Sequence, residues 1–214
     1  MQAESKPYLR ILVLGGTIFV AGCTTVTMTE PPQTATEQLL VTTAIDDAVA
    51  KMNVSSLAQG KRIFVDTSFF DGVGRDRTIL FPKYAMGAVR EKLLRAGALL
   101  ADDKQAADVI VELRTGGQSV DHNSLFVGIP SISIPFPPTF TSPITTPELA
   151  LFKRDRKTGV AKLAIVAYGH DSGALAGASG ASFGASNHTE YTVLLLFDWI
   201  ISDIEPKELQ DRTK

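Results

Sequence analysis

Few side-chain patterns in this chain could support catalysis. Residues 180–184 read Gly-Ala-Ser-Phe-Gly, which matches the Gly-x-Ser-x-Gly pattern that places a hydrolase serine on a strand-to-helix turn. Such a serine needs an acid and then a histidine later in the chain, but no acidic residue lies between Ser182 and His188. β-rich sequence, and not a helix, follows. We therefore expect a closely packed small-residue strand, and we keep an envelope hydrolase using Ser182 only as the third hypothesis.

Three histidines, His122, His170 and His188, each lie near an acidic residue. A catalytic zinc site needs three converging ligands and an open position. If the small-residue stretch between His170 and His188 is extended, these two histidines lie at opposite ends of it. We expect turn histidines in solvent, with no metal and no cofactor.

Cys23 is the only cysteine of the chain, so it cannot form an intrachain disulfide. A polar segment with Lys6 and Arg10 precedes an apolar run over residues 11–20, and Ala21 and Gly22 follow. This order of basic, apolar and small residues is typical of a secretory signal. The apolar run is half the roughly 20 residues that a membrane-spanning helix requires.

Residues 20–23, Val-Ala-Gly-Cys, resemble the lipobox of bacterial lipoproteins. The resemblance implies cleavage before Cys23, a diacylglycerol on its thiol, and anchoring in a membrane by this lipid. It also implies sorting: Thr24 stands where an aspartate would suggest retention in the inner membrane. The resemblance thus implies an outer-membrane lipoprotein that faces the periplasm.

The remaining sequence predicts one folded domain. A chain of 214 residues with 44% hydrophobic content is long enough for one well-packed core, and its net charge of -2 argues against nucleic-acid binding. We divide it into a signal peptide (1–22), the lipidated cysteine with a flexible tether (23–36), the domain (37–205) and a polar tail (206–214).

Periodicity predicts two main helices, one after Thr36 and one over residues 86–96 that stops at Gly97. Strands are expected over residues 61–68, 98–103, 108–116, 148–154, 160–168, 174–182 and 192–201. Turns are expected at 156–159, 170–173 and 187–188. The fold class is therefore α/β (α+β), a single domain whose mixed, mainly antiparallel sheet is flanked by two main helices. The run 193–201 is almost wholly apolar and predicts a central strand covered on both faces.

The basic cluster Lys-Arg-Asp-Arg-Lys at 153–157 falls where we expect a hairpin, and a solvated turn is the simpler interpretation. Contact with lipid headgroups or another anionic envelope polymer is the alternative.

Residues 122–147 form an unusual apolar segment with six prolines and no acidic or lysine or arginine side chain. An apolar loop of this length either folds over the sheet of its own domain or binds a partner. The residues that would contact a partner are Phe126, Ile129, Ile132, Ile134, Phe136 and Phe140.

Two stretches, Ala-Asp-Val-Ile-Val-Glu-Leu-Arg-Thr-Gly at 107–116 and the residues 162–180, resemble the sheet core of periplasmic lipoproteins such as the curli secretion lipoprotein and the penicillin-binding-protein activators. The resemblance implies an uncharacterised family of bacterial outer-membrane lipoproteins and no activity. We expect a non-enzymatic binding or assembly module of the cell envelope, with an envelope protein or a second copy as its partner. A subunit of a curli-type secretion channel is the alternative.

Overall fold

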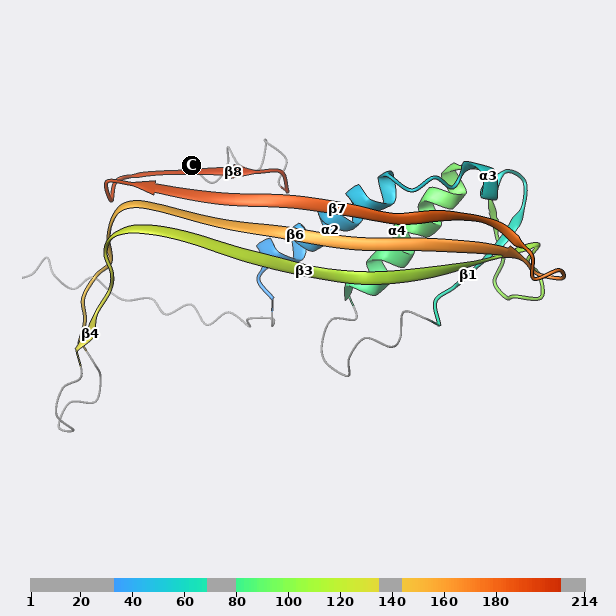
Figure 1. The fold of residues 1–214 in the computed structure, drawn as a ribbon, viewed down its shortest axis with the longest axis horizontal. Coiled ribbons are helices and arrows are strands. Elements are labelled where there is room, and N and C mark those ends of the chain that lie inside the picture. Colours follow the sequence, from blue (N-terminus) through green and yellow to red (C-terminus); the bar gives the residue numbers. More distant parts are fainter. Residues whose placement is uncertain (1–32, 69–79, 135–143, 205–214) are drawn as a thin grey trace, which may run out of the picture. The chain divides into compact units, whose positions relative to one another are not determined.

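The computed structural model describes residues 33–68, 80–134 and 144–204 (Figure 1). The predicted signal peptide 1–22, Cys23 and the tail 206–214 lie outside these residues. The helices are α2 (Ala35–Ala50), α3 (Ser55–Ala58) and α4 (Leu80–Arg95). The strands are β1 (Arg62–Asp66), β2 (Leu99–Leu100), β3 (Val109–Ile129), β4 (Ser133–Ile134), β5 (Ile144–Thr145), β6 (Leu149–Gly169), β7 (Leu175–Val193) and β8 (Phe197–Ser202).

Local sequence signals account for the ends of the two long helices. At the start of α2, the Thr34 hydroxyl accepts a hydrogen bond from the Glu37 backbone N–H, and the Glu37 carboxylate accepts one from the Thr34 N–H. This capping box satisfies two donors that the first helical turn leaves free. After α4, Gly97 adopts a φ of 92°, the left-handed conformation that commonly ends a helix. Both predicted main helices are confirmed.

Six strands form one mixed sheet in the order β2-β1-β3-β6-β7-β8. β1 runs parallel to β2 and β3, whereas all other neighbours in this sheet are antiparallel. β4 and β5 form a separate short antiparallel pair. The expected mixed, mainly antiparallel sheet with two main helices is therefore confirmed.

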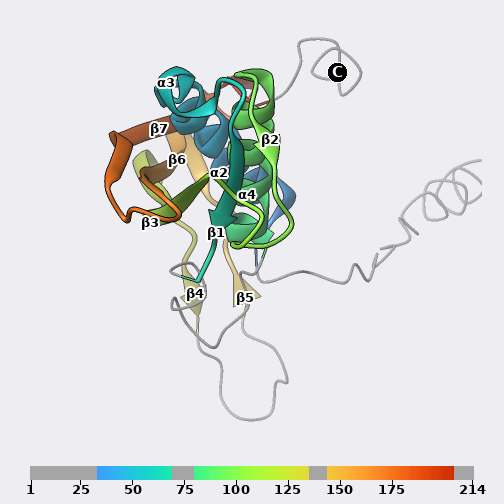
Figure 2. The same cartoon turned by 90° about the vertical axis from the view of Figure 1, so that its right-hand side faces the viewer.

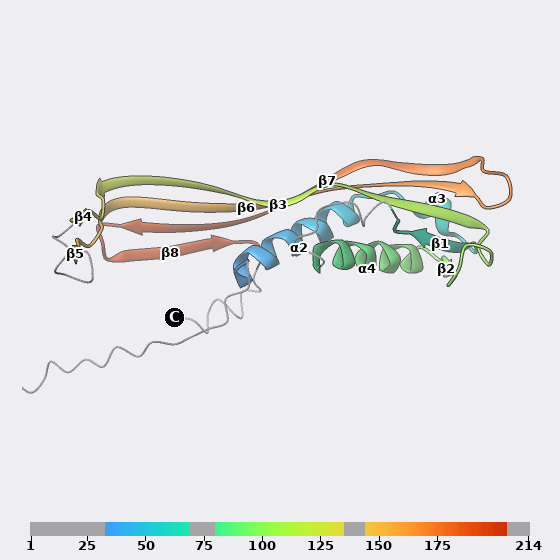
Figure 3. The same cartoon turned by 90° about the horizontal axis from the view of Figure 1, so that it is seen from below.

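Both long helices lie on one face of the sheet (Figure 3), and α2 packs beside α4 (Figure 2). We call residues 109–120, 159–169 and 175–186 the inner half of the three long strands. Residues 121–129, 149–158 and 187–193, with β8, are the outer half. The core lies between the helices and the inner half, and its fully buried side chains include Leu40, Ile45, Ile63, Phe81, Leu93, Leu113, Leu163 and Ile165.

The backbone of α2 approaches β6 and β7 very closely. A β-carbon on Gly184 would overlap the carbonyl oxygen of Ala44, and one on Gly159 would overlap that of Leu40. The Ser186 hydroxyl donates a 2.6 Å hydrogen bond to the same Leu40 carbonyl. Small residues at these sheet positions thus let α2 bond directly to the sheet.

The predicted turns at 156–159 and 187–188 are wrong. Residues 156–159 lie inside β6, which runs unbroken from Leu149 to Gly169, and residues 187–188 lie inside β7. Turn-forming residues are only a local preference, and here hydrogen-bonded neighbours on both sides hold β6 extended. Gly159 allows α2 to approach β6 closely and does not form a turn.

Replacing Gly184 tests this close approach. Gly184→Ala should lower the free energy of unfolding by about 2 kcal/mol or more, because backbone atoms of α2 must move. Gly180→Ala in the same strand is the matched control, because a β-carbon there meets open space, and its effect should stay within about 1 kcal/mol. Urea denaturation of both variants measures the difference, and equal effects would contradict the close approach.

Candidate functional site

The structure divides the predicted apolar insert. Residues 122–129 are not part of a loop, because they complete β3 and pair with β6. The prediction of an insert starting at residue 122 is therefore wrong, because residues 149–157 of β6 pair with this segment and make it part of the sheet. Phe126 is half-buried in this strand, and Ile129 is exposed at its end.

The rest of the insert leaves the sheet. The exposed Ile132 exchanges backbone hydrogen bonds with Thr146, donating to its hydroxyl at 2.9 Å and accepting from its N–H at 3.0 Å. Ile134 lies in β4, whereas Phe136 and Phe140 lie outside the described residues. Phe126 and Ile129 thus belong to the sheet and Ile132 and Ile134 to the segment beyond it, so the six predicted contact residues do not form one loop.

Ser182 lies in the middle of β7, where its backbone pairs with Leu163 of β6. The strand continues to Val193, so no strand-to-helix turn presents the hydroxyl. The side chain is buried at the sheet. The Gly-Ala-Ser-Phe-Gly stretch is a strand, and its second glycine, Gly184, makes room for α2.

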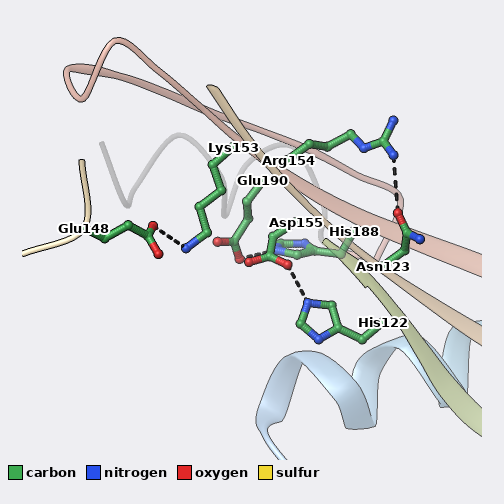
Figure 4. A network of polar contacts seen from close by, with 8 residues as sticks. All are labelled: His122, Asn123, Glu148, Lys153, Arg154, Asp155, His188 and Glu190. Atoms are coloured by element: carbon green, nitrogen blue, oxygen red, sulfur yellow. Dashed lines mark hydrogen bonds and ion pairs between the residues drawn. The ribbon is translucent and has the colours of Figure 1, made fainter. Parts of the chain in front are cut away.

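Two of the three histidines lie in strands and not in turns, which corrects our expectation. His122 of β3 and His188 of β7 both pair with Lys157 of β6, one from each side. His122 Nε2 donates to the Asp155 carboxylate, and His188 Nε2 lies 3.1 Å from Glu190 Oε1 (Figure 4). His188 is buried, with Nδ1 3.0 Å from the Ser202 hydroxyl. Cross-strand pairing of the extended β6 brings these polar groups together.

In the ranges that the structure describes, no three His, Cys, Asp or Glu side chains are arranged to hold a metal ion. Instead, His122 and Asp155 form a cross-strand contact and His188 and Glu190 a contact within β7, both on one face of the outer half (Figure 4). His170, in contrast, follows β6 in the turn that leads to β7, as expected.

The basic cluster 153–157 lies within β6 and is split between the two faces of the sheet. Lys153, Asp155 and Lys157 share the face that α2 covers further along the sheet, and Lys153 pairs with Glu148 at 2.9 Å. Arg154 and Arg156 alternate to the opposite face, which we call the open face. The predicted solvated hairpin is therefore wrong, because both neighbouring strands bond this segment.

The two arginines of the open face have neutral partners. Arg154 donates to the Asn123 amide oxygen at 3.3 Å and Arg156 to that of Asn187 at 2.8 Å. Among the described residues neither forms an ion pair, and Arg154 Nε has no hydrogen-bond partner. Their positive charge is thus not neutralised within the described part of the chain.

The open face of the inner half contains a groove of about 340 Å³. Its floor is made of small side chains, including Ala164, Val166 and Ala178, and Arg114 and Lys162 lie along it. The Lys162 ammonium lies 5.1 Å from the centre of the Phe183 ring, a cation–π distance. In the described residues, Arg114 and Lys162 also form no ion pair. We call this the open-face groove.

The run 193–201 is not a central strand, contrary to prediction. Residues 194–196 form a turn, and β8 is an edge strand that pairs only with β7 among the described strands. Leu194 and Leu195 have positive φ values of 51° and 64°. An apolar run alone does not tell a buried strand from an exposed edge, so sequence reasoning missed this surface.

The open face of the outer half is apolar and exposed. The Tyr191 and Trp199 rings stack there with centroids 5.1 Å apart and planes 10° from parallel. We define the outer apolar face as these rings and the exposed residues around them: Leu125, Val127, Leu194, Leu195, Leu196, Phe197 and Ile201.

The chain belongs to a family of unknown function, DUF6655, whose model matches residues 17–195. The matched range includes Cys23, the whole of β3, β6 and β7, and the first two leucines of the turn. A comparison with curated proteins finds no significant match. Within the described ranges, no helix has both the length and the apolar composition to span a membrane.

Asp155 provides a test of the polar contacts in Figure 4. The hydrogen bond from His122 holds the pKa of Asp155 below its ordinary value, against a smaller opposing effect of burial. A lowered pKa stabilises the fold above the ordinary value of about 3.9, and this stabilisation is lost as the pH falls through the folded-state pKa. Asp155→Asn should cost about 1 kcal/mol at pH 7, and this cost should become smaller at pH 2, as the carboxylate takes up a proton.

Urea denaturation at both pH values measures this difference. Asp121→Asn, an exposed carboxylate of the neighbouring strand, is the control and should change stability little at either pH. An Asp155→Asn cost that persists undiminished in acid would contradict the electrostatic origin of the effect.

Proposed function

We propose that this chain is a lipoprotein of the bacterial outer membrane, anchored through Cys23 and facing the periplasm, whose domain is a non-enzymatic binding or assembly module. One observation carries the proposal: a lipobox-like Val-Ala-Gly-Cys stretch precedes a domain whose described helices all lie on one face of the sheet (Figure 3). Ten residues separate Cys23 from Thr34, where α2 is capped.

The open-face groove is the partner site of this proposal. Its floor of alanine and valine side chains can accept an extended chain without displacing bulky groups. Arg114 and Lys162 supply two positive charges, and no acidic residue of the described chain forms an ion pair with either of them. An envelope protein with an extended acidic segment fits this combination of shape and charge.

An envelope hydrolase ranks last among the proposals. Ser182 lies in a strand, and the side chains within hydrogen-bonding distance of His188 are those of Ser202 and Glu190, not Ser182. A nucleophilic serine requires a base within hydrogen-bond reach, which this arrangement does not offer.

A subunit of a curli-type secretion channel is the second candidate, and one observation favours it. β3 pairs with β1 only as far as Glu112, and beyond this residue the edge of β3 that faces away from β6 has no partner among the described strands. β8 forms the opposite edge of the same sheet. The two edges run antiparallel, so that copies of the chain could pair edge to edge. Mass measurement of the detergent-solubilised protein separates the candidates, since a channel requires a closed assembly of several copies.

Mass spectrometry of the membrane-bound protein tests the anchor. We expect the mature chain to begin at Cys23 and to carry the mass of acyl chains on this residue, because several chains give effectively permanent attachment. Cys23→Ser should abolish both the processing and the added mass. A native chain that retains residues 1–22 and an unmodified Cys23 would contradict the proposal.

Photo-crosslinking in intact cells tests the groove. A crosslinking residue at Ala178, in the groove, should capture an envelope protein, whereas one at the exposed Lys83 on α4 should not. Combining Arg114→Glu with Lys162→Glu should reduce the captured product at least about tenfold, because both charges become repulsive to an acidic partner. Arg90→Glu, an exposed change on α4, is the charge control. Equal capture in both charge variants would exclude the groove as the site.

A further inference from the structure

We propose that the folded domain itself contacts an anionic lipid bilayer through the outer apolar face, with the turn of residues 194–196 inserted most deeply. This contact is separate from the lipid proposed on Cys23, and four features of the described residues support it. Only the last of them depends on the proposed anchor.

The side chains of this face are layered along the strands. The turn contributes three exposed leucines, and Leu196 is 80% exposed. The stacked rings of Tyr191 and Trp199 follow the turn, and Tyr191 lies two residues before the end of β7 at Val193. Arg154 pairs with Tyr191 and so lies at the level of the rings, and Arg156 lies two residues further along β6. Leucines at the tip, with aromatic and basic side chains behind them, are typical of proteins that enter a membrane interface.

The backbone conformation of the turn does not explain why leucines occupy it. Leu194 and Leu195 both have positive φ, a conformation that costs free energy for any side chain with a β-carbon and that Asn or Gly adopts more readily. Their side chains are exposed nevertheless. A strained turn that displays apolar side chains is explained by a contact outside the chain.

Charge favours lipid over a second copy on this face. The carboxylates of Asp155, Glu190 and Asp198 alternate to the opposite face, and Asp121 lies at the inner border of the open face. Asp203 accepts a hydrogen bond from the Asn187 N–H near Arg156, but among the described residues no carboxylate forms an ion pair with Arg154 or Arg156. Two copies packed symmetrically on this face would bring their arginines together, whereas phosphates of anionic lipids would neutralise them.

The direction of α2 allows both membrane contacts at once. Leu40 lies against Ser186 and Ala44 against Gly184, so α2 runs antiparallel to β7 and begins on the side of the outer half. With ten residues between them, Cys23 and Thr34 can lie at most about 35–40 Å apart. This argument rests on the proposed function, because it uses the anchor at Cys23.

Trp199 reports directly on this contact, because it is the only tryptophan of the chain. The experiment adds vesicles of phosphatidylethanolamine and phosphatidylglycerol to the full-length protein and records tryptophan emission. We expect a shift to shorter wavelength, and quenching by lipids brominated on their acyl chains. Quenching requires lipid to reach the ring, so a shift without quenching, or one that grows with protein concentration in the absence of vesicles, would indicate a protein contact and overturn the proposal.

Variants locate the contact. Leu194→Asn combined with Leu195→Gly and Leu196→Ser should fold, because these residues suit the turn, and should lose most of the quenching. Leu175→Ser, which removes a 71% exposed leucine at the other end of β7, is the matched control and should quench normally. Equal quenching in both variants would overturn the proposal.

The arginines test the charge. In the Cys23→Ser chain, Arg154→Gln with Arg156→Gln should raise the lipid concentration needed for half-maximal quenching about 25-fold. Each arginine should account for about fivefold of this change. Unchanged quenching in phosphatidylcholine vesicles would show that anionic headgroups have no role and would contradict this part of the proposal. Acylated Cys23 without Trp199 quenching would overturn the inference and leave the proposed anchor standing.

Discussion

The backbone contact between α2 and the inner halves of β6 and β7 determines how the rest of the sheet is covered. Gly159 and Gly184 permit this contact, and Ser186 fixes it by bonding to Leu40. A helix of 16 residues extends about 24 Å, whereas β3 and β6, with 21 residues each, extend about 70 Å. Helices of this length cannot cover such strands, so much of the outer half lies beyond the described helices. The surfaces that we assign to partners and lipid both lie on the opposite, open face of the sheet, where none of the described helices packs.

The parts of the fold that could be predicted were those with local causes. The capping box at Thr34, the apolar spacing of α2 and the left-handed Gly97 are all encoded within a few residues. The turns at 156–159 and 187–188 failed for the opposite reason, since the same polar residues suit a turn and a solvated strand. Whether they form one or the other depends on strands that are distant in sequence: Lys157 is held by His122 on one side and His188 on the other.

The candidate sites differ in the same way. Cys23 could be singled out because a signal and a lipobox are continuous stretches of sequence. The open-face groove could not, because Arg114 and Lys162 become neighbours only through the register of β3 and β6. The outer apolar face was mistaken for core because hydrophobicity indicates that a side chain avoids water and does not tell which surface shelters it. The sequence thus shows that Trp199 and the leucines beside it are apolar, but it does not predict whether they are buried or exposed.

The long separation between α2 and its partners in the sequence also constrains how the chain folds. The Ser186 to Leu40 bond joins residues 146 positions apart, whereas β6 and β7 meet across the short turn at residues 170–174. The β6–β7 hairpin can therefore form early, but α2, which is synthesised first, lacks part of the sheet that it covers until β7 is complete. A chain that ends before β7 would leave the side of α2 that faces β7 in water. Formation of the complete core consequently waits for nearly the whole sequence.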